Sequence, residues 1–146
     1  MIRNKFLFYF LSLTWGCIMT TIGAIVALAL IVTKHKPKKW GYCWYFEVGK
    51  NNWGGMELGP FFLCNKNPSE YIKNHEAGHG HQNCIFGPLM PFVICIPSAI
   101  RYWWREILVR SEKKKRSELP PYSSIWFEYQ ADNFGLKFME WYNNTK

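Results

Sequence analysis

Hydrophobic positions are concentrated near the start of the chain. Residues 6–32 carry no charged side chain, and short basic segments flank them on both sides. At roughly 1.5 Å per residue, a helix of this length can cross a hydrocarbon core of about 30 Å. The pattern predicts one uncleaved transmembrane helix, with residues 1–39 forming a membrane anchor and its basic flanks. A cleaved signal peptide is the alternative.

The flanking charges also predict an orientation for this single-pass anchor. Arg3 and Lys5 precede the run, whereas four lysines follow it, at positions 34, 36, 38 and 39. Positive flanks remain in the cytoplasm, so we expect the body of the protein to be cytoplasmic. The five cysteines form no CxxC pair, which agrees with a reducing compartment.

After the anchor, residues 40–146 predict one α+β domain. Residues 42–48 are rich in β-forming side chains, residues 49–55 in turn formers, and residues 56–64 are largely apolar. This succession predicts a β-hairpin or a small sheet. Pro60 cannot donate to a ladder, so the second strand should be an edge strand or be interrupted there.

Two helices and an apolar segment account for most of the remaining chain. Asn67 and Pro68 predict a helix start that continues to Phe86. The next apolar stretch, residues 84–104, contains three prolines and therefore predicts a re-entrant or interfacial hairpin. After a polar linker at residues 110–122, Ser123 or Ser124 can cap a last amphipathic helix over about residues 125–142.

The placement of basic residues distinguishes membrane lipid from nucleic acid as a partner. The net charge is +8, and its clusters at residues 34–39 and 110–116 adjoin apolar and aromatic segments. Basic residues in that setting favour anionic membrane lipid, and we expect no nucleic acid as a partner.

The nine residues 74–82 read NHEAGHGHQ and hold the candidate chemistry. His75 and His79 are four apart, so on a helix both imidazoles share one face and can reach one Zn²⁺. Glu76 can reach a water at that metal and act as its general base. A short motif also arises by chance, in which case these are surface histidines.

Two glycines in the same helix argue against a chance motif of surface histidines. Gly78 and Gly80 are poor helix formers, costing roughly 1 kcal/mol each relative to alanine. Their presence inside the helix predicts close approach by another backbone, or a functional site.

A third ligand is available downstream in the sequence EYQAD. Glu128 and Asp132 are four apart and share a helical face. Glu128 can bind the metal, and Asp132 can accept a hydrogen bond from the outer nitrogen of a ligand histidine. The alternative is an exposed acidic pair on an amphipathic helix.

HEAGH followed by EYQAD resembles the gluzincin metallopeptidases, within them the membrane-bound group of the CAAX prenyl endopeptidase and the bacterial heat-shock membrane protease. The resemblance implies a zincin-like domain in which a sheet edge binds an extended peptide. It also implies His75, His79 and Glu128 as zinc ligands, Glu76 as general base, and Asp132 as the acid behind a ligand.

The resemblance covers only residues 68–86 and 123–136, and this chain is much shorter than those proteases. Their oxyanion-stabilising residue has no evident counterpart; His81 and Tyr129 are candidates, and His81 faces away from a fourth ligand position. The HExGH…Q and GPL…PS patterns also resemble short bacterial membrane proteins.

The zinc hypothesis constrains topology, since all three ligands must lie on one side of the membrane. Residues 84–104 should therefore not cross it. The sequence thus predicts a membrane-anchored zinc metalloendopeptidase that hydrolyses peptides or membrane proteins through a zinc-activated water. The alternative is a non-catalytic membrane protein with a structural or vestigial zinc site that binds lipid or a membrane-protein partner.

Overall fold

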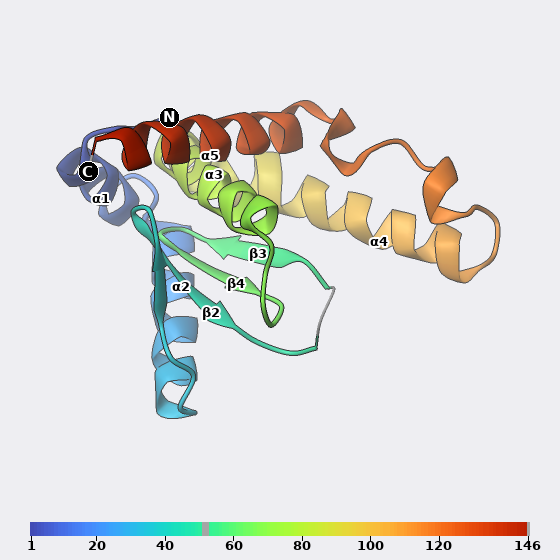
Figure 1. Ribbon diagram of the computed structural model, residues 1–146, viewed down its shortest axis with the longest axis horizontal. Coiled ribbons are helices and arrows are strands. Elements are labelled where there is room, and N and C mark those ends of the chain that lie inside the picture. The colour runs from blue at the N-terminus through green and yellow to red at the C-terminus, as the bar shows by residue number, and fades with distance from the viewer. Residues whose placement is uncertain (51–52, 146) are drawn as a thin grey trace.

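The computed structural model describes residues 1–50 and 53–145 and has an α+β fold (Figure 1). Its helices are α1 (Lys5–Leu13), α2 (Cys17–Val32), α3 (Glu70–Phe86), α4 (Ile96–Arg110) and α5 (Trp126–Asn144). Its strands are β1 (Lys38–Trp40), β2 (Cys43–Glu47), β3 (Gly55–Leu58) and β4 (Phe61–Cys64). Shorter helical turns cover Gly87–Leu89, Pro91–Cys95, Arg116–Glu118 and Tyr122–Ser124.

The long apolar run at the start forms two helices rather than the single helix predicted. α1 and α2 meet at an angle of 92°. The bend is fixed by the body of the protein: Asn83 Nδ2 donates to the carbonyl of Gly16 at 3.3 Å, and Trp15 donates to the carbonyl of Ile85 at 3.1 Å. Phe8 of α1 is fully buried. The first helix is therefore part of the folded core.

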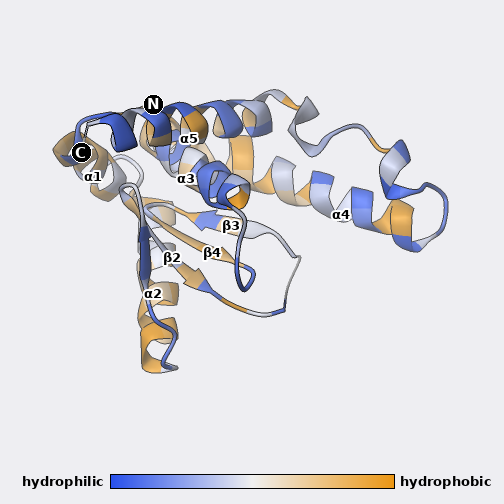
Figure 2. Ribbon diagram, viewed as in Figure 1, coloured by the Kyte–Doolittle hydropathy of each residue, from blue (hydrophilic) through white to orange (hydrophobic). Residues whose placement is uncertain are grey.

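No single helix in the described residues has both the length and the apolar character needed to cross a membrane. By length and composition alone, two sharply bent pairs qualify: α1 with α2, and Glu70–Leu89 with Pro91–Arg110. α2 is the most continuously hydrophobic element of the chain (Figure 2).

The single hairpin is wrong, and the small sheet, one of the two predicted alternatives, is confirmed. Its order is β1-β2-β4-β3, with β2 parallel to β4 and the other pairs antiparallel. The second predicted strand, residues 56–64, is itself a hairpin, β3–β4, that turns at Gly59 and Pro60, and only its second arm, β4, runs parallel to β2. Pro60 lies in this turn, where its missing N–H is harmless. Of the predicted turn at residues 49–55, residues 51–52 lie outside the described residues.

Helix starts also differ in detail. Ser69 rather than Asn67 caps α3, accepting from the N–H of Ile72, while Asn67 has a positive φ of 51°. The helix ends at Gly87, as predicted, with a φ of 54°. The last helix begins at Trp126 with Ile125 at the cap position and no side-chain cap. Ser123 and Ser124 instead belong to the short turn before it.

The predicted apolar hairpin at residues 84–104 is a sharply broken helix. The chain turns by 113° between Glu70–Leu89 and Pro91–Arg110 and then continues without reversal into α4. Pro91 and Pro97 do not break this second arm, because each stands at the beginning of a helical segment where no N–H partner is needed. α4 projects away from the sheet (Figure 1).

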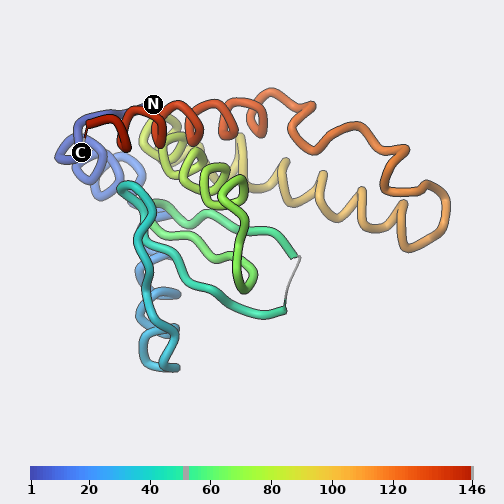
Figure 3. The backbone as a smooth tube through the Cα atoms, in the orientation of Figure 1, coloured from blue at the N-terminus to red at the C-terminus, as the bar shows by residue number. Residues whose placement is uncertain are grey.

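Helices α3 and α5 run side by side (Figure 3), and their contact positions the candidate site. A Cβ on Gly78 would lie 1.9 Å from the carbonyl oxygen of Ala131, and one on Gly135 would lie 1.8 Å from that of Asn74. Gly80 lies against Cys43 and the carbonyl of Gly59. The glycines therefore permit the close backbone approach that the sequence predicts.

Candidate metal centre

Two imidazoles from one face of α3 form the base of the site. His75 and His79, one turn apart, are both largely buried, and their Nε2 atoms are 3.1 Å from each other. Their rings are perpendicular, with centroids 4.7 Å apart. The interpretation of these residues as surface histidines is therefore wrong.

Glu128 completes the group from the first turn of α5. Its side chain is fully buried, and Oε2 lies 3.1 Å from His75 Nε2 and 3.3 Å from His79 Nε2. The alternative of an exposed acidic pair is thus wrong for Glu128. The close contact between α3 and α5 brings this carboxylate to the two rings.

The other ring nitrogens face oxygen acceptors. His75 Nδ1 lies 2.7 Å from Asp132 Oδ1, and His79 Nδ1 lies 2.7 Å from Gln82 Oε1. The Gln82 amide is itself oriented, because its Nε2 donates to the carbonyl of Phe127 at 2.8 Å and to Gln130 at 3.0 Å. These acceptors place the hydrogen of each neutral imidazole on Nδ1, so both Nε2 lone pairs face the centre.

Lone pairs that converge in this way are stabilised by a cation between them. Glu128 Oε2 is buried and has no partner among the described residues other than the two imidazole nitrogens, and the three ligand atoms all lie within 4.8 Å of one another. Tetrahedral coordination at about 2.0–2.1 Å separates ligand atoms by roughly 3.3–3.4 Å. The observed separations of 3.1–3.3 Å nearly match that spacing. The three residues can therefore hold a metal ion.

The pKa shifts of His75 and Glu128 indicate that the site favours a positive charge between these side chains. Burial by itself would lower the pKa of His75, but the hydrogen bonds that its ring donates to Asp132 and Glu128 outweigh burial and raise this pKa to about 10. Burial opposes ionisation of Glu128, yet its interactions with His75 and His79 hold its pKa below the usual range. Two carboxylates thus stabilise a cation at this position.

Glu76 lies beside the centre and faces a cavity. It is buried, and a Cβ on Gly55 would lie 2.5 Å from its Oε1, so the carboxylate rests against the backbone of β3. Burial raises the pKa of Glu76, and the neighbouring His75 and His79 partly offset this effect. A raised pKa suits a carboxylate that must accept and return a proton near neutral pH.

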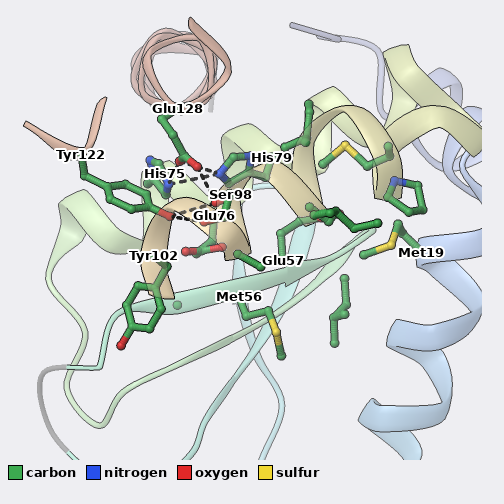
Figure 4. Close-up of a pocket in the computed structure, with 18 of the residues that line it drawn as sticks. Met19, Met56, Glu57, His75, Glu76, His79, Ser98, Tyr102, Tyr122 and Glu128 are labelled. Atoms are coloured by element: carbon green, nitrogen blue, oxygen red, sulfur yellow. Dashed lines mark hydrogen bonds and ion pairs between the residues drawn. The ribbon is translucent and has the colours of Figure 1, made fainter. Parts of the chain in front are cut away.

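The cavity has a volume of about 620 Å³ and reaches from the candidate metal ligands to the region between β3, α2 and α4 (Figure 4). Glu57, Glu76, Ser98 and Tyr122 also line it, and Ser98 lies beside Glu128 with Tyr122 next to it. Much of its wall is apolar, including Met19, Met56, Leu58, Met90, Ile94 and Trp103. A cavity of this size is within the range that holds small-molecule ligands, and it can accommodate a large apolar side chain.

Two candidates for the oxyanion-stabilising residue lie elsewhere. His81 is 1% exposed, packs against Phe8 and Phe138, and accepts from the N–H of Ile2 at 3.3 Å. Tyr129 is 63% exposed and does not line the cavity. The structure therefore places neither candidate at the site, and for His81 this agrees with the expectation that it lies on a different face of the helix from the ligands.

Other residues at the site were not predicted as members of it. Gln82 follows His79 by three positions, and this helical spacing could have identified it. Ser98 reaches Glu128, and Tyr122 reaches Ser98, only through the path of α4 and the turn before α5. No local pattern in the sequence signals that approach.

Comparisons of the chain with models of protein families, with curated proteins and with solved structures find no match. The geometry of the site alone therefore carries the functional argument.

Proposed function

We propose that this protein is a zinc-dependent metallopeptidase that acts at a membrane. The observation that carries the proposal is the convergence of His75, His79 and Glu128 at the wall of a cavity that Glu76 also faces. Two imidazoles and one carboxylate form the ligand set of a catalytic zinc site with an open position. A purely structural site would be closed by a fourth protein ligand, and the described residues place none there.

The chain's own residues divide the work of peptide hydrolysis. When bound, zinc acts as a Lewis acid toward the scissile carbonyl and the attacking water. Glu76 accepts the proton of that water and returns it to the leaving amine, for which its raised pKa is suited. Asp132 and Gln82 hold the two imidazoles in the tautomer that exposes Nε2.

The cavity favours an apolar peptide as substrate. Apolar side chains form most of its wall, among them thioether and aliphatic groups from α2, β3 and the helical segment after α3. β3 is one of the two edge strands of the sheet and pairs only with β4 among the described strands. An extended peptide with large apolar side chains can lie beside β3 with one side chain in the cavity.

Exposed apolar surface supports action at a membrane. On α4, Ile96, Ile100, Trp103, Trp104 and Ile107 are at least 49% exposed. α2 exposes Ile18, Ile22, Ile25, Leu28 and Ile31. Basic residues follow both helices, at residues 34–39 and 110–116. Such surfaces bind the interface of a bilayer that contains anionic lipid, where membrane-protein substrates are found.

The test is zinc content and peptide cleavage of the purified chain, compared with Glu76→Gln and His75→Ala. Glu76→Gln should keep the metal and lose about 10²- to 10⁴-fold in kcat, because only the base is removed. His75→Ala should lose both metal and activity. The substrates are casein and quenched peptides with leucine or phenylalanine beside the scissile bond. A zinc shell of four protein ligands, seen by X-ray absorption, would contradict the proposal.

A further inference from the structure

Glu128 uses its two carboxylate oxygens differently. Oε2 faces the two imidazoles, whereas Oε1 accepts a hydrogen bond of 2.5 Å from Ser98 Oγ. Ser98 belongs to the first turn of α4, an element that supplies none of the three candidate ligands. The side chain that would bind the metal is therefore held by a helix outside the α3–α5 pair.

The hydroxyl of Tyr122 extends this contact into a chain. Ser98 Oγ lies 2.9 Å from the Tyr122 hydroxyl, and Ser98 has only one hydrogen to donate. Since an ionised Glu128 can only accept, the Ser98 hydrogen points to Oε1 and Tyr122 donates to Ser98 Oγ. The Tyr122 hydroxyl also reaches the Ser98 carbonyl at 3.3 Å. Both hydroxyls thus have one consistent direction of donation, toward the carboxylate.

Side chains on the same face of α4 form hydrogen bonds with residues 120–124, the segment that leads into α5. Arg101 donates to the carbonyl of Pro121 at 3.0 Å and to Ser124 Oγ at 2.7 Å. One turn further, Arg105 donates to the carbonyl of Pro120 at 2.5 Å. Both guanidinium groups also lie over the ring of Tyr122, 5.8 and 5.7 Å from its centroid. These contacts fix Tyr122 in place against Ser98.

We infer that Ser98 and Tyr122 are positioning residues for the metal: their hydroxyl chain fixes the carboxylate of Glu128 so that one oxygen alone faces the ion. A carboxylate without this restraint can rotate and lose the alignment of Oε2 with the two imidazoles. Hydrogen bonds of this kind to ligating groups typically change metal affinity by about 10- to 100-fold. The inference rests on the metal-binding part of the proposed function.

The experiment measures zinc affinity by competition with a chromophoric chelator, using the full-length chain in detergent. Ser98→Ala should weaken zinc binding about 10-fold or more, and Tyr122→Phe should weaken it by a smaller factor because it removes only the outer donor. Ser98→Thr retains a hydroxyl and should bind zinc as the wild type does. Ser111→Ala, which removes an exposed hydroxyl at the other end of α4, is the matched control.

A spectroscopic measurement separates positioning from folding. Co²⁺ bound in place of zinc should show altered visible absorption bands in Ser98→Ala and unaltered bands in Ser98→Thr, and circular dichroism should show equal helix content in all variants. Equal zinc affinity and equal Co²⁺ spectra in wild type, Ser98→Ala and Tyr122→Phe would overturn the inference. A wild type that binds neither metal would instead refute the proposed function. If Ser98→Ala does not fold, Tyr122→Phe alone decides.

Discussion

Gly78 of α3 lies directly against the backbone carbonyl of Ala131 of α5, where a Cβ would be only 1.9 Å from the oxygen. A backbone carbonyl cannot move aside as a flexible side chain can. The distance between the two helices, and with it the distance from Glu128 to the imidazoles, therefore depends on a missing methyl group.

Replacing Gly78 by alanine should push α5 away from α3. We expect Gly78→Ala to lower the free energy of unfolding by about 1–3 kcal/mol, even though alanine favours the helix by roughly 1 kcal/mol. Zinc affinity should fall as well. Chemical denaturation and chelator competition measure both effects. Leu136→Ala, at a position 52% exposed on α5, should change neither quantity by much.

Asp132 should affect metal binding without contacting the metal. It accepts from His75 Nδ1 at 2.7 Å and from the Tyr71 hydroxyl at 3.2 Å. Asp132→Asn weakens the control of the His75 tautomer, and zinc affinity should fall by about 10- to 100-fold. Chelator competition measures the change. Glu140→Gln removes an exposed acid from the same helix and should leave the affinity unaltered.

The buried His81 predicts a pH dependence of stability. Burial lowers the pKa of His81 to about 3, whereas a free histidine has about 6.5. The unfolded chain therefore binds a proton that the folded chain excludes as pH falls below 6.5. Stability from this group is complete above pH 6.5 and is lost toward pH 3, at up to ~1.4 kcal/mol per pH unit.

His81→Gln keeps an acceptor for the N–H of Ile2 and cannot take up this proton. Its free energy of unfolding, measured with chelator present between pH 7 and pH 4.5, should decline less steeply than that of wild type. His35→Gln, outside this core, should retain the wild-type slope. Equal slopes in wild type and His81→Gln would show that His81 is not excluded from protonation in the folded state.

The position of α1 in the core gives a test of the bent arrangement. Phe8 is fully buried and contacts Tyr42 and His81, whereas Phe6 is 78% exposed. Phe8→Ala should lower the free energy of unfolding by about 3–5 kcal/mol, and Phe6→Ala should have little effect. Denaturation in mild detergent measures both. Equal effects of the two substitutions would instead favour a straight anchor helix independent of the body.

Local sequence patterns predicted which residues form the site, but they did not predict how the chain folds around it. The spacing of His75 and His79, and of Glu128 and Asp132, is a property of single helices, so the sequence predicted which side chains share a face. Gly78 and Gly80 predicted close packing because their cost in a helix needs a tertiary reason. In the structure, His75, His79 and Glu128 form a cluster that can hold a metal ion.

Tertiary contacts determined what the sequence did not predict. The apolar run of residues 6–32 bends because Asn83 and Ile85, far along the chain, bind its turn. β2 pairs in parallel with β4, a choice that alternation of side chains does not specify. Nothing in the amphipathic sequence of α4 distinguishes Ser98 until the fold places Glu128 beside it. None of these partners is near in sequence.

Gly55 is the position on β3 against which the carboxylate of Glu76 packs. Because it lacks a Cβ, the carboxylate of Glu76 rests on the strand at that one step. A peptide aligned beside β3 can shift its register by two residues and keep the same side chains toward the cavity, whereas a shift by one turns them over. On the proposed mechanism, the register of the peptide on β3 therefore determines which peptide bond is cut. The allowed registers differ by two residues, and the fit of a side chain in the cavity selects one of them.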